Sequence, residues 1–447
     1  MSATGHTLPL IRALARAITA VFYRVDEAGS VPAAGPVLLL PNHPNALLDP
    51  AVIWATSGRD VRFLAKSTLF DGPFGPILKG AGAIPVYRRL DQGVDASRNS
   101  ETFSAVQNAL TAGDAVCLFP EGISHSTGRL EPLRTGAARM AIGAEQEGTR
   151  VSVIAVGLNF ERKTAFRSRV TVLYGPPFSI SDLADQPGGA RLATARIADQ
   201  MRRVLVEADP GGDAAMVARV ERLYSAARGQ PRSPQERVAR QQAISRGIER
   251  LREANPVRFE TTALRLRRYD QRLQRFGLHD RHLDWDVSIG GAIAFALREA
   301  AIAVPLFPIG AAGFVLFWVP YQLTGLLSRR ATTERDVAAT AKVFVGGAVY
   351  AAWLLIIAIS AGMRLGTGAG VLAAVLIPAL AVAGLFAIER ETAVLDTIRA
   401  WWFLRRARRQ TRTRLKEARG ELAALLDEIY EWLSAGTRGQ ADERMPN

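Results

Sequence analysis

Residues 287–388 are the segment that most limits how this chain can fold. They consist mostly of Ala, Val, Leu, Ile, Gly and Phe, and one helical crossing of a bilayer needs only about 20 apolar residues. A backbone in hydrocarbon must satisfy its own N–H and C=O groups, so a segment of this kind is expected to form membrane helices. The first 280 residues are charged and resemble a soluble protein. The 447-residue chain therefore combines at least two kinds of structure.

The apolar region divides into shorter runs. Residues 287–327 are long enough for two crossings with a turn near Pro305 and Pro308, and two more runs cover 343–362 and 369–388. This pattern predicts four membrane segments arranged as two helical hairpins. Whether the part before Pro305 crosses the membrane or lies in its interface is left open.

The basic residues set the orientation of these segments. A polar stretch with Arg329, Arg330 and Arg335 follows the second predicted crossing, and the tail after residue 390 is rich in Arg. Positively charged loops stay on the cytoplasmic side. Two complete hairpins keep both basic segments there, with the first 280 residues on the same side.

The remaining sequence alternates between strand-like and helix-like segments. Strands are expected at 36–43, 61–66, 82–88, 115–122, 151–160 and 169–178, and helices at 45–58, 96–114 and 136–148. Such alternation predicts an α/β domain with helices packed against a sheet.

These patterns give a domain division. The expected parts are an amphipathic N-terminal helix at 1–30, the α/β domain at 31–187, a helical extension at 188–284, the membrane region at 285–390 and a basic cytoplasmic helical tail at 391–447. The N-terminal helix could lie on lipid or pack on the domain, and both readings stay open.

The net charge of +14 is compatible with a nucleic-acid binder or with a protein on an anionic membrane face. The apolar C-terminal third favours anionic lipid and argues against nucleic acid. Only five of the 56 basic residues are Lys, a bias typical of a GC-rich bacterial genome. We therefore expect a multi-pass protein of the bacterial inner membrane, with its α/β domain in the cytoplasm.

The stretch "PNHPNALLDP" holds the strongest candidate residue, His43. It follows a predicted strand, where α/β folds place reactive groups, and an imidazole can accept a hydroxyl proton near neutral pH. A carboxylate such as Asp49 could hold the ring in the required tautomer. Alternatively, the segment only turns the chain and Asp49 faces solvent.

Further candidates stand near the ends of other predicted strands. Glu121 and Gly122 belong to "FPEGISHS", a sharp turn that could hold an anion. Arg88 and Lys66 could bind a phosphate, although basic residues at strand ends are commonly just solvated. Cys117 lies in the apolar run "AVCLF" and is expected to be buried.

Together and in this order, these motifs resemble the glycerophosphate and lysophosphatidate acyltransferase superfamily. Its four blocks are similar to "NHPNALLD", "GAIPVYR", "FPEG" and "VIAVG", over about residues 15–185. The resemblance implies an α/β fold: an acyltransferase domain with a mixed sheet covered by helices, followed by the helical extension and the membrane region.

The resemblance also implies roles for the residues. His43 would be the general base for an acceptor hydroxyl, and Asp49 would orient it. Arg88 would bind the substrate phosphate, while Glu121 and Gly122 would shape the glycerol phosphate site. Substrate-binding roles are also assigned to Lys66 and His125, where His125 would contact phosphate or hydrogen-bond the turn.

The chain departs from the family pattern in three places. Five residues separate His43 from Asp49 where the family usually has four. Ala155 stands where proline is usual, and Ile123 and Ser124 stand where many members have Thr-Arg. These features look like the branch of fungal glycerol-3-phosphate/dihydroxyacetone-phosphate acyltransferases and their bacterial relatives.

The predicted function is a membrane-bound glycerolipid acyltransferase of phospholipid synthesis, on the route to phosphatidic acid. It would transfer a fatty acyl group from acyl-CoA or acyl-carrier protein to glycerol 3-phosphate or 1-acylglycerol 3-phosphate, without a metal or other cofactor. Expected partners are these substrates and anionic membrane lipids. The alternatives are another lysolipid acceptor, such as an ornithine lipid precursor, or a non-catalytic lipid-binding or scramblase-like protein.

Overall fold

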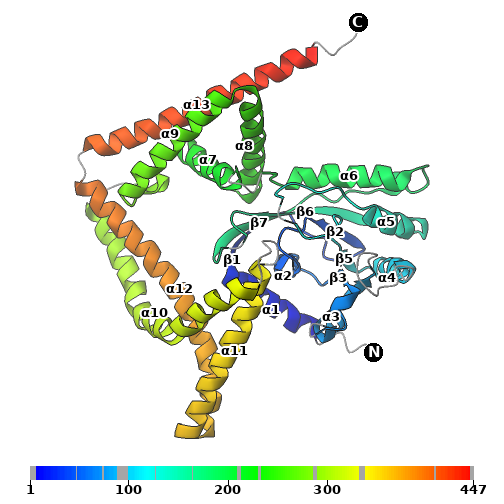
Figure 1. Ribbon diagram of the computed structural model, residues 1–447, viewed down its shortest axis with the longest axis horizontal. Coiled ribbons are helices and arrows are strands. Elements are labelled where there is room, and N and C mark those ends of the chain that lie inside the picture. Colours follow the sequence, from blue (N-terminus) through cyan, green and yellow to red (C-terminus); the bar gives the residue numbers. More distant parts are fainter. Residues whose placement is uncertain are drawn as a thin grey trace. The chain divides into compact units, whose positions relative to one another are not determined.

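The computed structural model describes residues 7–46, 48–72, 75–87, 99–125, 127–163, 165–208, 213–229, 233–284, 289–331, 338–406 and 409–442. The chain forms two compact units (Figure 1). The first comprises Met1–Val217, Ser233–Gln242 and Glu334–Thr340, and the second comprises Ala218–Arg232, Ala243–Thr333 and Ala341–Asn447.

The first unit is built around a seven-stranded mixed sheet in the order β1-β7-β6-β2-β5-β3-β4. The strands are β1 (Tyr23–Ala28), β2 (Val37–Pro41), β3 (Val61–Lys66), β4 (Ile84–Val86), β5 (Ala115–Cys117), β6 (Ser152–Phe160) and β7 (Ser168–Tyr174). Strands β6, β2, β5, β3 and β4 are parallel, whereas β7 runs antiparallel to β6 and parallel to β1. The carboxyl ends of the five parallel strands therefore meet at one edge of the sheet.

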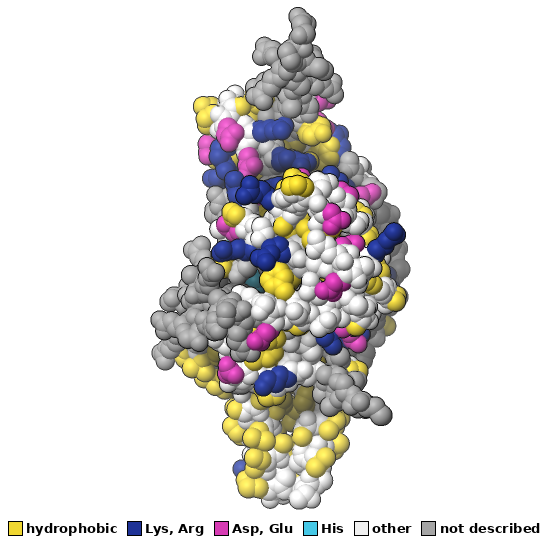
Figure 2. All heavy atoms as spheres, turned by 90° about the vertical axis from the view of Figure 1, so that its right-hand side faces the viewer, with side chains coloured by type: hydrophobic (Ala, Val, Ile, Leu, Met, Phe, Trp, Pro, Cys, Tyr) yellow, Lys and Arg dark blue, Asp and Glu magenta, His cyan; other side chains and the backbone are white. Residues whose placement is uncertain are grey.

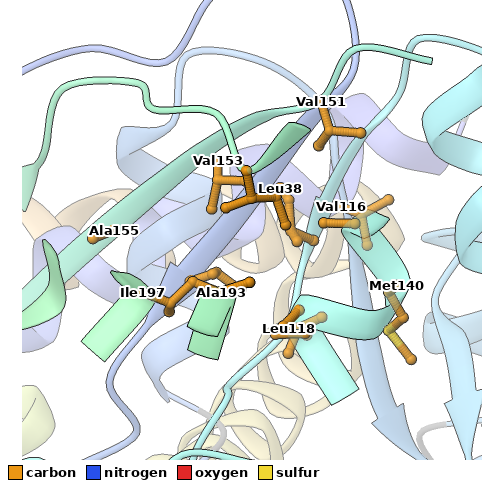
Figure 3. Close-up of a cluster of buried hydrophobic side chains, with 14 of the residues drawn as sticks. Leu38, Val116, Leu118, Met140, Val151, Val153, Ala155, Ala193 and Ile197 are labelled. Atoms are coloured by element: carbon orange, nitrogen blue, oxygen red, sulfur yellow. The ribbon is translucent and has the colours of Figure 1, made fainter. Parts of the chain in front are cut away.

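Helices cover both faces of this sheet (Figure 1). They are α1 (Thr7–Phe22), α2 (Leu48–Thr56), α3 (Gly75–Gly80), α4 (Asn99–Thr111), α5 (Gly136–Gln146) and α6 (Gly189–Val204). Helices α4, α5 and α6 supply one core cluster with the sheet. Figure 3 shows part of it, with Leu38, Val116 and Val153 from the strands beside Met140 and Ile197 from the helices.

The alternation of side chains along the strands explains this layering. In β2, Leu38 and Leu40 belong to the cluster under α4–α6, while the fully buried Leu39 between them lies outside it. Successive strand residues point to opposite faces, so Leu39 faces the layer that contains α2. A strand buried on both faces is continuously apolar, as "VLLL" is.

One strand lies where the sequence predicts a helix. The expected N-terminal helix ends at Phe22, and Tyr23–Ala28 forms β1 at the edge of the sheet. The full length of β1 pairs in parallel with β7, from Tyr23 opposite Ser168 to Ala28 opposite Leu173. Long-range pairing of this kind overrides the helical spacing of the preceding residues.

The second unit is helical. It contains α9 (Pro256–Arg275), α10 (Ile289–Ala331), most of α11 (Ala338–Leu365), α12 (Thr367–Arg406) and α13 (Arg409–Asp442), and the unit boundary passes through α7 (Asp213–Arg228) and α8 (Pro234–Ala254). Ion pairs connect its helices: Arg219 of α7 pairs with Asp270 of α9, and Arg258 of α9 pairs with Glu428 of α13.

Three stretches of the described helices are long and apolar enough to cross a membrane: Gly310–Ser328, Val345–Leu365 and Thr367–Gly384. The last two are almost wholly unburied, and Figure 2 shows hydrophobic side chains covering the lower end of the view, which α11 and α12 form. Such a surface is unfavourable in water and suited to lipid. The described residues thus give three candidate spans where the sequence predicts four, and the first of the two expected hairpins is not found.

The turn expected near Pro305 and Pro308 is not formed. Helix α10 continues through both prolines from Ile289 to Ala331. Apolar helices tolerate proline where neighbouring helices pack closely. Here α10 packs along α12, where a Cβ on Gly313 would lie 3.3 Å from the Cα of Gly384. The indole Nε1 of Trp353 in α11 also donates to the Leu316 carbonyl of α10.

The position of Leu38 leads to a stability prediction. Leu38→Ala removes a fully buried side chain from the central strand and is expected to lower the free energy of unfolding by about 2–5 kcal/mol. The melting temperature of the purified protein in detergent tests this. Leu192→Ala on α6, where the side chain is 47% exposed, is the control and should change it little. Equal effects of the two substitutions would contradict the layered core.

Candidate active site

Several polar side chains meet at the edge formed by the carboxyl ends of the parallel strands. His43 follows β2, Glu121 follows β5 and Lys163 follows β6. Asn42 extends the ladder beyond β2, because its Oδ1 accepts the Leu158 N–H at 2.8 Å and its Nδ2 donates to the Leu158 carbonyl. Ligands of open α/β sheets commonly bind at this edge.

The His43 and Asp49 side chains are in direct contact. The Nδ1 of His43 lies 2.9 Å from Oδ2 of Asp49, and the His43 ring stacks on Phe119 with its centroid 3.9 Å away. The His43 side chain is 15% exposed and that of Asp49 is fully buried. Because a carboxylate oxygen only accepts, Nδ1 donates and the Nε2 lone pair is left free. No hydrogen bond to Nε2 is found in the described part of the chain.

Burial has the largest effect on the pKa of Asp49. It raises the pKa of the Asp49 carboxyl, although the hydrogen bond and charge of His43 and the Asn45 N–H act in the opposite direction. Oδ2 accepts the Asn45 N–H at 2.8 Å as well as the His43 bond, but the buried Oδ1 has no partner within the described residues. A buried carboxylate with one unsatisfied oxygen gains strongly from a neighbouring positive charge. The His43 and Asn45 donors therefore compensate in part for the burial of the Asp49 carboxylate.

The loop between His43 and Asp49 is bonded at every described residue. The Pro44 carbonyl accepts from Lys163 Nζ at 2.6 Å. Asn45 Nδ2 donates to the Tyr23 hydroxyl, which itself donates to the Lys163 carbonyl. Ala46 has a φ of +46°, and its N–H donates to the Ser124 hydroxyl at 3.1 Å. The left-handed turn at Ala46 lies within the five-residue interval, and Asp49 reaches the imidazole across it.

Glu121 fastens the turn after β5 to this loop. Its Oε1 accepts the His43 N–H at 3.0 Å, and its Oε2 accepts the Glu131 N–H at 2.9 Å and contacts His125 Nε2. Glu121 is buried, and both of its oxygens are bonded to protein groups. This arrangement favours a role in holding the loop, while direct contact with substrate stays a prediction.

Gly122 and His125 complete the turn. Gly122 has a φ of +75°, and a Cβ there would lie 3.3 Å from Cγ of Arg134, so a side chain would be strained and crowded. The His125 ring contacts Glu121 through Nε2 and Thr127 Oγ1 through Nδ1. With both nitrogens engaged, His125 makes the structural hydrogen bond that was one of its two expected roles.

Of the two other predicted phosphate ligands, Lys66 belongs to the described part of the chain. Lys66 ends β3 and is half-buried at the same edge, opposite Val86 of β4. Arg88 lies outside the described residues. Their roles stay predictions.

Cys117 is buried in β5, as expected. Burial raises the pKa of the Cys117 thiol well above its usual range, with the nearby Asp49 charge adding to the effect. A protonated thiol is a poor nucleophile. No group of His, Cys, Asp and Glu suited to a metal ion occurs in the ranges that the structure describes.

Four contributing residues were not singled out in the sequence: Tyr23, Asn45, Ser124 and Lys163. Lys163 follows a parallel strand whose end lies beside that of β2, and this adjacency could have been inferred only from the strand order. Ser124 was noted only as a departure from the family pattern. Tyr23 lies in the strand that the sequence did not predict.

Comparison with known proteins supports the same region. Residues 22–159 match the family model described as Acyltransferase. These residues form an acyltransferase domain. The acyltransferase domain contains every described residue of the loop around His43 and of the turn after β5.

The related proteins match parts of the chain. Glycerol-3-phosphate O-acyltransferase 2 of Saccharomyces cerevisiae is 38% identical over 84 residues, which is 18% of this chain and 11% of the yeast protein. Lyso-ornithine lipid O-acyltransferase of Brucella abortus is 31% identical over 143 residues, which is 31% of this chain and 51% of that enzyme. The chain thus spans about a tenth of the first relative and about half of the second.

A solved structure is also similar. The 1-acyl-sn-glycerophosphate (LPA) acyltransferase from Thermotoga maritima aligns with 44% of this chain and 79% of its own, at 17% identity and a TM-score of 0.35. At this score the two structures are only weakly alike.

The His125 environment predicts a pH dependence. Burial disfavours a charged His125, but the bond and charge of Glu121, with help from Glu131, outweigh burial and the opposing Lys163 and raise the pKa of His125. A histidine with a raised folded pKa contributes stability below its unfolded pKa of about 6.5 and loses it as pH rises through the folded value. The melting temperature of His125→Gln should therefore fall furthest below wild type in acid.

This difference is measured from about pH 5.5 to 8.5, the range in which an ordinary histidine titrates. Gln keeps a hydrogen-bonding group but cannot be protonated, so the gap should narrow as pH rises above about 6.5. His279→Gln, at an exposed histidine of the helical unit, is the control. A gap that stays constant across the range, or widens toward alkaline pH, would contradict a charged His125–Glu121 pair.

Proposed function

We propose that this chain is a membrane-bound glycerolipid O-acyltransferase and that His43 is its general base. The single observation that carries the proposal is the 2.9 Å contact between His43 Nδ1 and the buried Asp49 carboxylate. This contact leaves Nε2 of His43 free to act as a base at the edge of the sheet. The match of residues 22–159 to the Acyltransferase family supports the reaction class.

In the proposed reaction, His43 Nε2 removes the proton from an acceptor hydroxyl as its oxygen attacks the thioester carbonyl of the donor. A C–O bond forms, and the resulting tetrahedral intermediate expels the thiolate as the C–S bond breaks. The imidazolium then returns the proton to the thiolate sulfur. General-base catalysis of this kind contributes about 10²–10⁴-fold to the rate.

Asp49 acts through His43. It holds the ring so that Nε2 lacks a proton, and it stabilises the imidazolium that forms during attack. Full burial strengthens this stabilisation, because water does not screen the two charges. The proposed reaction is a direct transfer without a covalent acyl-enzyme. It uses neither Cys117 nor a metal ion or other cofactor.

The acceptor is proposed to be glycerol 3-phosphate or 1-acylglycerol 3-phosphate, with acyl-CoA or acyl-carrier protein as donor. The yeast relative is named for the first acceptor. A second candidate is a lyso-ornithine lipid, because the match to the Brucella enzyme covers more of this chain, 143 residues against 84. The proposed phosphate ligands Lys66 and Arg88 would favour the phosphate-bearing acceptors.

The test is acyl transfer by the purified protein from labelled acyl-CoA and from acyl-carrier protein to each of these three acceptors. His43→Ala should lower kcat by about 10²–10⁴-fold, the share of a general base. Asp49→Asn should give a loss of the same order, since an amide no longer fixes the tautomer. His279→Ala, an exposed histidine of the helical unit, is the control and should match wild type.

Equal activity of wild type and His43→Ala on an acceptor would remove His43 from the mechanism. An absence of transfer by wild type from either donor to all three acceptors would favour the non-catalytic, lipid-binding alternative.

The protein is proposed to lie in the bacterial inner membrane with its acyltransferase domain in the cytoplasm. The basic residues Arg329, Arg330 and Arg335 should then stay on the cytoplasmic side. A topology reporter inserted after residue 335 tests this, with a reporter at the C-terminus as the reference. A cytoplasmic signal at both positions is expected. A periplasmic signal after residue 335 would contradict this orientation.

A further inference from the structure

Ala46 is in an unusual conformation at the centre of the loop that joins His43 to Asp49. Its φ of +46° lies in the left-handed region, which is strained for a residue with a Cβ. Such a conformation persists only where surrounding contacts enforce it. Five residues separate His43 from Asp49. The turn at Ala46 brings the His43 and Asp49 side chains together across them.

The carbonyl of Ala46 connects this conformation to Asp49. It accepts the Asp49 N–H at 3.3 Å, and the Asn45 carbonyl accepts the Leu48 N–H at 3.1 Å. These two bonds fix the first turn of α2, from which the Asp49 side chain reaches His43. A rotation of the Ala46 backbone would therefore move the carbonyl that holds Asp49.

The N–H of Ala46 is held from the turn after β5. It donates to Oγ of Ser124 at 3.1 Å. The neighbouring His125 N–H donates to the His43 carbonyl at 3.2 Å, and Glu121 accepts the His43 N–H. Of these three contacts, the Ser124 bond is the one that a side-chain hydroxyl makes and that acts on Ala46 itself.

We propose that Ser124 is a positioning residue for acyl transfer, which holds Ala46 in its left-handed conformation and thereby keeps Asp49 on His43. The proposal rests on the proposed function. It also links two departures from the family pattern: the longer interval before Asp49 and the serine after Gly122. In this chain the second compensates for the first.

The predicted consequence is a specific loss of turnover. Without the hydroxyl, the half-buried Ala46 N–H loses its partner, and the backbone can relax from the strained region. Asp49 then shifts relative to the imidazole. Displacements of about 1 Å in catalytic groups can cost about 100-fold in rate. Substrate binding is unaffected if Ser124 does not touch substrate.

The test compares kcat and KM of four variants with wild type, using the acyl-CoA donor and the acceptor that wild type uses best. Ser124→Ala should lower kcat about 10- to 100-fold with KM unchanged. Ser124→Thr keeps a β-hydroxyl and should restore most of kcat. Ser179→Ala is the matched control, because Ser179 Oγ also accepts a backbone N–H at 3.1 Å, that of Ser181, on an exposed loop. His43→Ala reports on the proposed function itself.

The outcomes separate the two proposals. If His43→Ala is inactive and Ser124→Ala retains wild-type kcat, the positioning role is wrong and the proposed function stands. If Ser124→Ala raises KM instead, or if Ser124→Thr is as slow as Ser124→Ala, the positioning role is also wrong. If His43→Ala is fully active, the proposed function fails first. Should Ser124→Ala not fold, Ser124→Cys replaces it, because sulfur is only a weak acceptor and the same loss of kcat is expected.

Discussion

The hydrogen bond between His43 and Asp49 is the interaction on which the rest of the site depends. Asp49 is fully buried, and one of its oxygens has no partner among the described residues. Burial of a carboxylate is costly unless nearby donors and positive charge compensate for it. His43, the Asn45 N–H and the charge of Lys163 provide that compensation. The surrounding contacts keep those donors in place.

Three segments far apart in the sequence hold this loop. Lys163 follows β6, Tyr23 begins β1, and Glu121 with Ser124 follows β5. The parallel strand order brings the ends of β6, β2 and β5 together. The sheet thus positions the site, and the loop itself contains little internal bonding beyond the contacts to Asp49 and the start of α2.

Much of the α/β domain could be predicted from the sequence. The expected strand at 61–66 coincides with β3, and the expected strand at 151–160 differs from β6 by one residue. Their apolar runs are strong local signals. In contrast, β1 depends on pairing with β7, about 145 residues away, and no local pattern reveals it. The turn predicted at the prolines of α10 was wrong for a related reason: packing against α12, which no local pattern reveals, accompanies a continuous helix.

The site was predictable in part. His43, Asp49 and Glu121 followed from motifs whose chemistry is visible in the residue types. Asp49 reaches His43 across the longer interval because the backbone of Ala46 is left-handed. An alanine in the sequence gives no sign of such a conformation. The role of Ser124 was also not predictable, because only the strand order shows that its hydroxyl lies beside the loop.

The most direct test of the His43–Asp49 hydrogen bond is the tautomer of His43, read by ¹⁵N NMR of protein labelled at its five histidines. The signal is assigned as the one that is lost in His43→Ala. The His43–Asp49 hydrogen bond predicts a proton on Nδ1 that is held less strongly in Asp49→Asn, and an Nε2 shift typical of an unprotonated ring nitrogen. A proton on Nε2, or an Nδ1 signal unchanged in Asp49→Asn, would contradict it.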